Sequence, residues 1–390
     1  MKSICAVEGV SAAGIKEGKY GITLIKASGN AAAVFTKNLF SAATVIFMKE
    51  RIKNGYLDGI IVNSGNANVY TGDRGIRDAE KMTEIAAGIF GTTPDRIGVA
   101  STGVIGRFLR MDIIEDQCRR IAPSLCNSPG AEDDAAMAIM TTDIVAKHAH
   151  YLGKSFTVAG IAKGSGMIAP NMGTMLAFLY TDADVRSSDL NDILLRATER
   201  SFNRVVVDGD TSTNDCAFIT ATGKKGTPDM EEFAFAVESV CISLARQIAA
   251  DGEGATKRIE VRVINAENEE NAAVIAKTVV LSPLVKCAVY GEDPNWGRVL
   301  AAAGRAGVDF DPNEIIVSIG NGKEEVILAR RGEILADNEV NPGVLALAKK
   351  MMAGKEVTFT FDLAQGECEA MAWGCDLTEK YVEINGRYTT

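Results

Sequence analysis

The stretch from residue 159 to residue 183 constrains the fold of this chain more than any other part of the sequence. It begins as an apolar run, becomes a loop rich in glycine, proline and asparagine, and returns to an apolar run at Met175. The loop residues favour turns, and the short apolar runs on either side predict buried strands. Thr174 directly follows Gly173 and therefore falls at the mouth of the second strand.

Thr174 is a candidate nucleophile at this strand mouth. A threonine hydroxyl is a weak nucleophile and needs a neighbouring base. If the chain is cut between Gly173 and Thr174, the new α-amine supplies that base, with a pKa of about 7.7–8.0. On local composition alone, the simpler interpretation is an ordinary loop-to-strand junction with a turn glycine and a buried hydroxyl.

Histidine, the usual catalytic base, is scarce in this chain. His148 and His150 are its 2 histidines, in the sequence Lys-His-Ala-His-Tyr. That spacing would place both rings on one face of a strand, whereas a helix would point them apart. Their neighbours favour an exposed strand end or loop over a site. A Ser-His-Asp or Cys-His site would have to use this pair, and an N-terminal amine removes the need for it.

Composition argues against several classes of protein. With 47% hydrophobic and 24% charged residues the chain is an ordinary globular protein. Its formal net charge of −10 argues against a nucleic-acid-binding surface, which needs a basic face. The 8 cysteines form no Cys-x-x-Cys pair and lack zinc spacing with histidine, so no metal is expected. Without an apolar stretch of about 18 residues we expect no membrane span or export signal, and a cytoplasmic location.

Short β-like runs alternate with amphipathic helical patterns up to about residue 255. Strands are predicted at residues 32–35, 59–63, 96–100, 156–161, 176–181, 205–208 and 218–221. Helices are predicted at residues 77–90, 112–121, 188–201 and 230–251. A second unit is expected from residue 256, where residues 258–264 alternate as a half-buried strand. Further strands are predicted there at residues 314–319, 325–330, 356–363, 367–373 and 381–384.

Three polar or glycine-rich loops invite functional interpretations. Residues 100–106 follow a strand and can aim backbone N–H groups at an anion or oxyanion, although a simple turn explains them too. Residues 251–257 lack the Gly-Lys-Ser/Thr ending of a phosphate loop, and a helix end explains them. Residues 208–219 fail as a calcium loop because Thr213 and Ile219 replace the required glycine and glutamate.

The sequence Lys163-Gly-Ser-Gly-Met-Ile168, followed by Pro170-Asn-Met-Gly-Thr-Met-Leu176, resembles the processing site of the ornithine acetyltransferase (glutamate N-acetyltransferase) family. The resemblance extends over nearly the whole chain. It implies self-cleavage between Gly173 and Thr174, giving an α chain of residues 1–173 and a β chain from residue 174. The family usually has alanine where this chain has Gly173. Because glycine is smaller and conformationally freer, we expect cleavage to survive.

The same resemblance implies a fold and an assembly. The fold class is α+β: a mixed α/β/β/α sandwich of the self-processing N-terminal nucleophile type over residues 1–255, and a smaller α+β domain over residues 256–390. Two α and two β chains are expected to associate.

Site residues are carried over by the same resemblance. Thr174 is the nucleophile, and the Thr102 hydroxyl and the Gly103 N–H form the oxyanion hole. The expected substrate contacts are Thr142 (with Thr141 as the alternative), Lys163 for an α-carboxylate, Glu253 for an ammonium, and Asn385 and Thr390 in the C-terminal tail. Each has a simpler interpretation when taken alone, such as a solvated lysine or a fraying terminus.

The implied activity is acetyl transfer from N2-acetyl-L-ornithine to L-glutamate in arginine biosynthesis, through an acetyl-Thr174 intermediate with ping-pong kinetics. No cofactor or metal is expected, and acetyl-CoA is a candidate second donor. The nearest alternative is a self-processing aminopeptidase or amidase, in which water resolves the acyl-enzyme. A non-catalytic protein whose glycine loops bind a phosphate or an amino acid is the alternative from another class.

Overall fold

The computed structural model describes residues 3–169 and 175–387, which form two compact units. The first unit takes Met1–Asn203 with Asp210–Leu244, and the second takes Arg204–Gly209 with Ala245–Thr390. Each unit is built on one mixed β-sheet, so the α+β character expected from the sequence is confirmed. The domain boundary expected between residues 255 and 256 stays a prediction.

The first sheet has the order β4-β3-β2-β9-β7-β6-β5, and β1 also pairs with β2. Its central strands β7 and β9 are buried along their whole length, as their continuous apolar runs predict. The strands are β1 (Ser11–Glu17), β2 (Tyr20–Phe35), β3 (Tyr56–Asn66), β4 (Ile97–Val104), β5 (Lys147–Leu152), β6 (Thr157–Lys163), β7 (Leu176–Thr181) and β9 (Cys216–Ala221).

Strand β2 is long enough to pair with different strands along its two halves. Its first half pairs with β1 and β3, and its second half, from Asn30, pairs with β9. The register with β3 shifts between Lys26 and Gly29. A Cβ on Gly29 would lie 1.8 Å from the carbonyl oxygen of Ala221, so only glycine fits at this irregularity.

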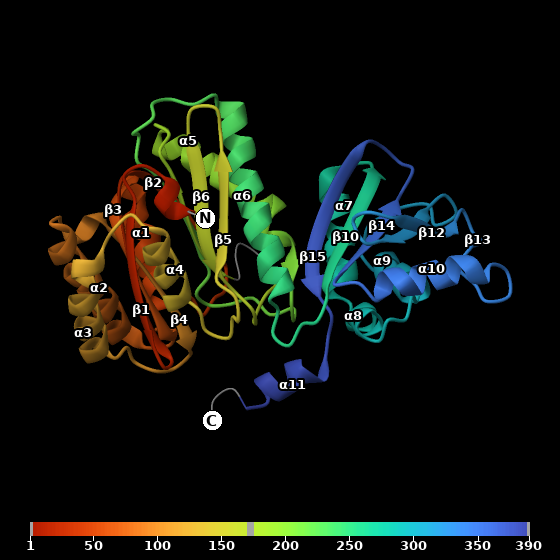
Figure 1. Cartoon of the computed structure of the whole chain (residues 1–390), viewed down its shortest axis with the longest axis horizontal. Helices are drawn as coiled ribbons and strands as arrows, with labels where there is room; N and C mark the ends of the chain where they lie inside the picture. Colours follow the sequence, from red (N-terminus) through yellow and green to blue (C-terminus); the bar gives the residue numbers. More distant parts are fainter. Residues whose placement is uncertain (1–2, 170–174, 388–390) are drawn as a thin grey trace. The chain divides into compact units, whose positions relative to one another are not determined.

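Helices cover the strands of the first unit. Helices α2 and α3 lie side by side in Figure 1, with α2 packed on β3 and β4 and α3 on β1 and β2. Helix α4 also packs on β1 and β2, and α5 packs on β2 and β9. The helices are α1 (Ala43–Arg51), α2 (Gly72–Phe90), α3 (Met111–Ile121), α4 (Pro129–Ala138), α5 (Ser187–Arg200) and α6 (Met230–Ala250).

Helix α6 is, by length and apolar composition, the described helix that matches a membrane span. The consecutive helices α7 and α8 pass the same test only as a pair bent by 59°. Phe233, Leu244 and Ile248 of α6 are each 0% exposed. These buried side chains identify α6 as a core helix, the common reason for a soluble protein to match such a pattern.

The second sheet has the order β13-β12-β11-β14-β10-β15-β8. Strand β10 lies between parallel β14 and antiparallel β15, and its alternating burial agrees with the half-buried strand predicted there. The strands are β8 (Val205–Val206), β10 (Arg258–Ala266), β11 (Ile316–Gly320), β12 (Glu325–Arg330), β13 (Glu333–Ile334), β14 (Glu356–Asp362) and β15 (Cys368–Cys375). The helices are α7 (Glu269–Leu281), α8 (Pro283–Tyr290), α9 (Trp296–Gly304), α10 (Pro342–Met352) and α11 (Glu379–Asn385).

The strand predicted at residues 381–384 is wrong, because this segment belongs to helix α11. Its β-branched and aromatic residues suggested a strand, yet β-propensity depends strongly on a neighbouring strand and on burial. Val382 is 68% exposed, and Lys380 pairs with Glu383 at 2.9 Å, a spacing that supports a helix.

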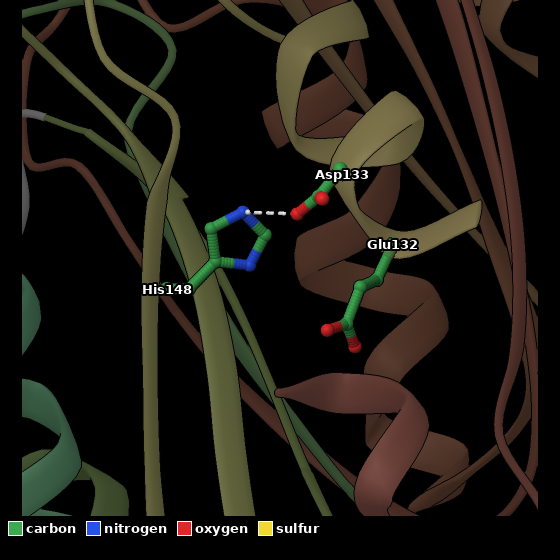
Figure 2. A group of neighbouring side chains, drawn as sticks. All are labelled: Glu132, Asp133 and His148. Carbon is green, nitrogen blue, oxygen red and sulfur yellow. Dashed lines mark ion pairs between the residues drawn. The ribbon is translucent and has the colours of Figure 1, made fainter. Parts of the chain in front are cut away.

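A buried carboxylate on α4 holds the beginning of the described chain. The two oxygens of Glu132 accept hydrogen bonds from the backbone N–H groups of Ser3 (2.6 Å) and Cys5 (2.8 Å), at the short helix Ile4–Ala6. Figure 2 shows the His148 ring of β5 pointing at the neighbouring Asp133, with Nε2 3.3 Å from Oδ1. The Nδ1 of His148 lies 2.9 Å from the hydroxyl of Ser3.

We expect Glu132→Gln to lower the free energy of unfolding by about 1–3 kcal/mol, because the new amide would turn a donor toward one of the two backbone N–H groups. Urea denaturation measures this change. The matched control is Asp133→Asn on the same helix; Asp133 is 59% exposed, and its variant should stay within about 0.5 kcal/mol of the wild type. Equal effects of both substitutions would contradict the anchoring role.

Candidate active site

A transverse row of paired residues runs across strands β1 to β4 in the first unit. Lys16 pairs with Gly21, Gly21 with Ser64, and Ser64 with Thr102. Side chains of directly paired residues emerge on the same face of a sheet, and neighbouring strands lie about 4.8 Å apart. Lys16, Ser64 and Thr102 therefore share one face, and the row brings the predicted oxyanion residue Thr102 close to Lys16.

Gly103 has a conformation that suits glycine alone. Its φ is +131°, in the region that L side chains avoid. A Cβ there would lie 2.3 Å from the carbonyl carbon of Gly65 on the paired strand. The predicted pair Thr102–Gly103 thus lies at the end of β4, where only glycine fits the second position, and Thr102 is 7% exposed. Their role as an oxyanion hole stays a prediction.

Lys16 reaches across Gly21 to its partners. A Cβ on Gly21 would lie 2.9 Å from the Cδ of Lys16, so the missing side chain makes room for the lysine. The ammonium of Lys16 donates to the Ser64 hydroxyl at 2.7 Å and to the carbonyl of Met140 at 2.5 Å. Burial, and then the charge of Lys163, lowers the pKa of Lys16 to about 8, although the carboxylate of Asp143 opposes this shift.

Asp143 is the buried carboxylate of this site, with a side chain that is 0% exposed. It accepts hydrogen bonds from the ammonium of Lys147 (2.8 Å) and from the backbone N–H groups of Gly164 (2.6 Å) and Thr141 (3.1 Å). The ammonium of Lys163 lies 3.9 Å away. Burial raises the pKa of Asp143, but the charges of Lys163 and Lys147 and these hydrogen bonds outweigh it and bring the pKa down to about 2.

Lys163 lies at the end of β6, directly opposite Leu176, the first residue of β7. It is 8% exposed, so the interpretation as a solvated surface lysine is wrong. Gly173 and Thr174 lie outside the described residues, and Thr390 does too. The segment that carries the predicted nucleophile is thus attached to a strand whose first residue pairs with Lys163.

The segment from residue 139 to residue 143 forms the turn after α4. Thr141 and Thr142 are both half-buried in this turn. The backbone N–H of Thr141 is held by Asp143, which fixes the turn next to Lys163. Thr142 as the substrate contact stays a prediction.

The polar loop 210–215 connects β4 to the segments on either side of residues 170–174. The amide of Asn214 donates to the carbonyls of Ala67 (2.6 Å) and Ser101 (2.7 Å). The N–H of Cys216 donates to the carbonyl of Met175 at 3.1 Å, and Thr211 forms a β-bridge with Ile168. This loop, part of the segment that fails as a calcium loop in the sequence, is a hydrogen-bonded polar turn.

Two predicted substrate residues of the second unit meet each other. The amide of Asn385, at the end of α11, donates to Oε2 of Glu253 at 2.7 Å. Glu253 is 7% exposed, and the following Gly254 has φ +73°. A Cβ on Gly254 would lie 2.7 Å from the backbone nitrogen of Tyr381, so glycine lets α11 approach this closely. Residues 132 positions apart are therefore brought into contact.

Within the described part of the chain, Glu132, Asp133 and His148 could offer a metal ion one atom each, within 4.8 Å of one another. Both oxygens of Glu132 already accept backbone N–H groups, and the ring of His148 lies between Ser3 and Asp133. This arrangement explains the cluster as an anchor, and we assign it no metal.

Sequence reasoning missed Lys16 and the central place of Asp143. Lys16 is one of 41 lysine and arginine residues, and its neighbours in the sequence do not distinguish it. Its partners Ser64 and Met140 lie 48 and 124 positions away, so only the folded structure shows the contacts.

Comparison with known proteins gives extended matches. The model of the ArgJ family matches residues 7–390. A glutamate N-acetyltransferase of Methanosarcina mazei is 49% identical over 393 residues, which span 99% of this chain and 98% of that protein. The arginine biosynthesis bifunctional protein ArgJ of Archaeoglobus fulgidus is 46% identical over 387 residues, which span 99% of this chain and 100% of that protein. A crystal structure of an arginine biosynthesis bifunctional protein from Bacillus halodurans is 37% identical and covers 53% of this chain and 95% of its own, with a TM-score of 0.48.

We expect Asp143→Asn to lower the free energy of unfolding by about 3–5 kcal/mol at pH 7, because it leaves the buried Lys147 ammonium without its carboxylate. The pKa of about 2 lies below the usual value of 3.8, so this stabilisation is present above about pH 4 and is lost as the pH falls toward 2. Urea denaturation of both proteins at several pH values measures the difference.

The double variant Asp143→Asn with Lys147→Met removes both charges and serves as the control. It should recover part of the loss, because the Lys147 ammonium is no longer left buried without Asp143, while the loss at Lys163 remains. A difference between wild type and Asp143→Asn that stayed constant from pH 7 to pH 2 would contradict this account of Asp143.

Proposed function

The chain belongs to the ArgJ family, and on that premise we propose that it is a glutamate N-acetyltransferase of arginine biosynthesis. It takes the acetyl group of N2-acetyl-L-ornithine and transfers it to L-glutamate. The observation that carries this proposal is the full-length similarity to the glutamate N-acetyltransferase of Methanosarcina mazei, at 49% identity. The string around Lys163 and Thr174, which resembles the processing site of the family, supports the same chemistry.

The proposal extends to the finer description of the fold. Residues 1–255 form an α/β/β/α sandwich of the N-terminal nucleophile type, and residues 256–390 form a smaller α+β domain. The change of partners along β2 supports two stacked parts of the first sheet. Two α and two β chains make up the cytoplasmic enzyme. It needs no metal or cofactor, and acetyl-CoA is its candidate second donor.

Self-cleavage produces the nucleophile. The hydroxyl of Thr174 attacks the carbonyl carbon of Gly173, and the peptide bond between them is replaced by an ester as the nitrogen of Thr174 gains a proton. Water then hydrolyses the ester, which frees the Gly173 carboxylate, the Thr174 hydroxyl and the Thr174 α-amine. That amine is the base that an N-terminal threonine needs.

Acetyl transfer follows in two halves. The Thr174 hydroxyl attacks the acetyl carbonyl of N-acetylornithine while its α-amine takes the proton. Thr102 and the Gly103 N–H stabilise the oxyanion, and the C–N bond breaks as the proton passes to the departing ornithine amine. The amine of glutamate then attacks the acetyl-threonine ester and restores the hydroxyl of Thr174.

Charged residues recognise the groups that ornithine and glutamate share. Lys163 and Thr142 bind the α-carboxylate, and the contact of Lys163 with buried Asp143 supports a fixed ammonium. Glu253 binds the substrate ammonium with Asn385 and Thr390, and the hydrogen bond from Asn385 to Glu253 supports a fixed carboxylate.

Steady-state kinetics test this function against its alternatives. We expect ornithine release beyond one equivalent per enzyme only in the presence of glutamate, N-acetylglutamate as product, and parallel double-reciprocal lines when both substrates are varied. Release of acetate without glutamate would support the self-processing amidase instead. Stoichiometric ligand binding without turnover would support a binding protein.

Substitutions at the nucleophile and the oxyanion hole should separate their roles. Thr174→Ala is expected to abolish both cleavage and transfer. Thr102→Ala is expected to lower kcat by about 10²- to 10³-fold, because one oxyanion donor is lost. Thr102→Ser keeps the hydroxyl and is the control. Gel electrophoresis and rate assays provide the readouts, and normal transfer by Thr174→Ala would rule out the mechanism.

A further inference from the structure

We propose that Lys16 binds the side-chain carboxylate of the acceptor and so selects a dicarboxylic amino acid. The inference rests on the proposed acetyl transfer and adds a specificity-determining residue to it. Lys16 has no part in the roles carried over from the family. Its position, its charge surroundings and the chemistry of the two substrates lead to this assignment.

Lys16 lies between two segments that have proposed roles in acetyl transfer. Lys16 bonds Ser64, the residue that pairs with Thr102, and also bonds the carbonyl of Met140, which precedes Thr141. Its ammonium therefore lies between the strand end proposed to stabilise the oxyanion and the turn proposed to bind the substrate. Neighbouring strands are about 4.8 Å apart, so Ser64, which Lys16 contacts, lies about one strand spacing from the proposed oxyanion residue Thr102.

The charges around Lys16 do not balance. Lys147 is hydrogen-bonded to Asp143, Lys163 lies 3.9 Å from the same carboxylate, and the charges of both Asp143 and Lys163 act on Lys16. Burial raises the pKa of Asp215 well above its usual value, which weakens it as a further counter-charge. Among the residues that the structure describes, Lys16 forms no ion pair. Partly buried ammonium groups in excess of carboxylates favour an anionic ligand.

The ammonium of Lys16 also has one more N–H donor than it has recorded acceptors. An ammonium carries three N–H donors, and the two recorded acceptors of Lys16 are the neutral oxygens of Ser64 and Met140. The third donor can meet a carboxylate. Charge-assisted hydrogen bonds of this kind are about twice as strong as neutral ones.

Ornithine and glutamate differ in the charge of their side chains. Glutamate carries two carboxylates, whereas ornithine carries one carboxylate and a side-chain ammonium. With Lys163 on the α-carboxylate, a second cation is needed for the glutamate side chain.

Lys16→Met tests the proposal because the two half-reactions can be measured separately. We expect the rate of acetyl-enzyme formation from N-acetylornithine to stay within about 3-fold of the wild type. The KM for glutamate in the second half should rise about 10- to 100-fold, the effect of losing one charged hydrogen bond. Glutamine, with an uncharged side chain, is the probe of specificity. The wild type should prefer glutamate strongly, and Lys16→Met should lose most of that preference.

Three further variants complete the design. Lys16→Arg keeps the charge and should retain the preference for glutamate. Lys26→Met is the matched control, because Lys26 also donates to a backbone carbonyl, that of Phe90 at 3.0 Å, and lies on β2 well along from Gly21. Should Lys16→Met fail to fold, Lys16→Gln, which keeps a donor for Ser64, carries the same expectation.

An equal fall in both half-reactions would overturn the proposal, because it would point to oxyanion stabilisation or to a structural role. An unchanged preference for glutamate over glutamine would overturn it as well. A wild type without acetyl transfer would instead overturn the proposed function, so the two failures are distinguishable.

Discussion

A carboxylate without solvent contact stays charged only when several hydrogen-bond donors contact it. Donors from three parts of the chain contact Asp143. Lys147 begins β5, Gly164 follows β6, and Thr141 lies in the turn after α4. If the Asp143 carboxylate were neutral, these three segments would lose their common acceptor. The placement of Lys163, at the end of β6 and opposite the first residue of β7, depends on the same group, since its ammonium lies 3.9 Å from Asp143.

Glycine residues allow the close backbone and side-chain approaches of the candidate active site. Gly21 leaves space for Lys16 to reach Ser64, and Gly103 adopts a positive φ against the backbone of Gly65. Gly103 lies on β4, which carries the proposed oxyanion pair, and Gly21 lies on β2 in the row of paired residues that leads to it. In the second unit Gly254 plays a corresponding role, because it allows α11 to bring Asn385 to Glu253. We infer that these close backbone approaches position the charged side chains. The charged side chains in turn distinguish the substrates.

Local patterns in the sequence predicted much of the fold. The apolar run at residues 176–181 is strand β7, and the helical periodicity at residues 188–201 is α5, displaced by one residue. The tail segment 381–384 failed because its strand-forming residues have no strand beside them and an ion pair supports a helix. Lys163 could be singled out only by resemblance to a family. Lys16 could not, since its contacts join residues 48 and 124 positions apart and leave no local pattern.

The central claim, a threonine nucleophile made by self-cleavage, is tested most directly by mass spectrometry of the denatured protein with N-terminal sequencing of each fragment. The account predicts two chains, one of which begins Thr174-Met175-Leu176. After incubation with N-acetylornithine alone, the peptide that begins at Thr174 should carry one acetyl group, and addition of glutamate should remove it. A single uncut chain that still transfers acetyl, or acetyl found on any other residue, would contradict the account.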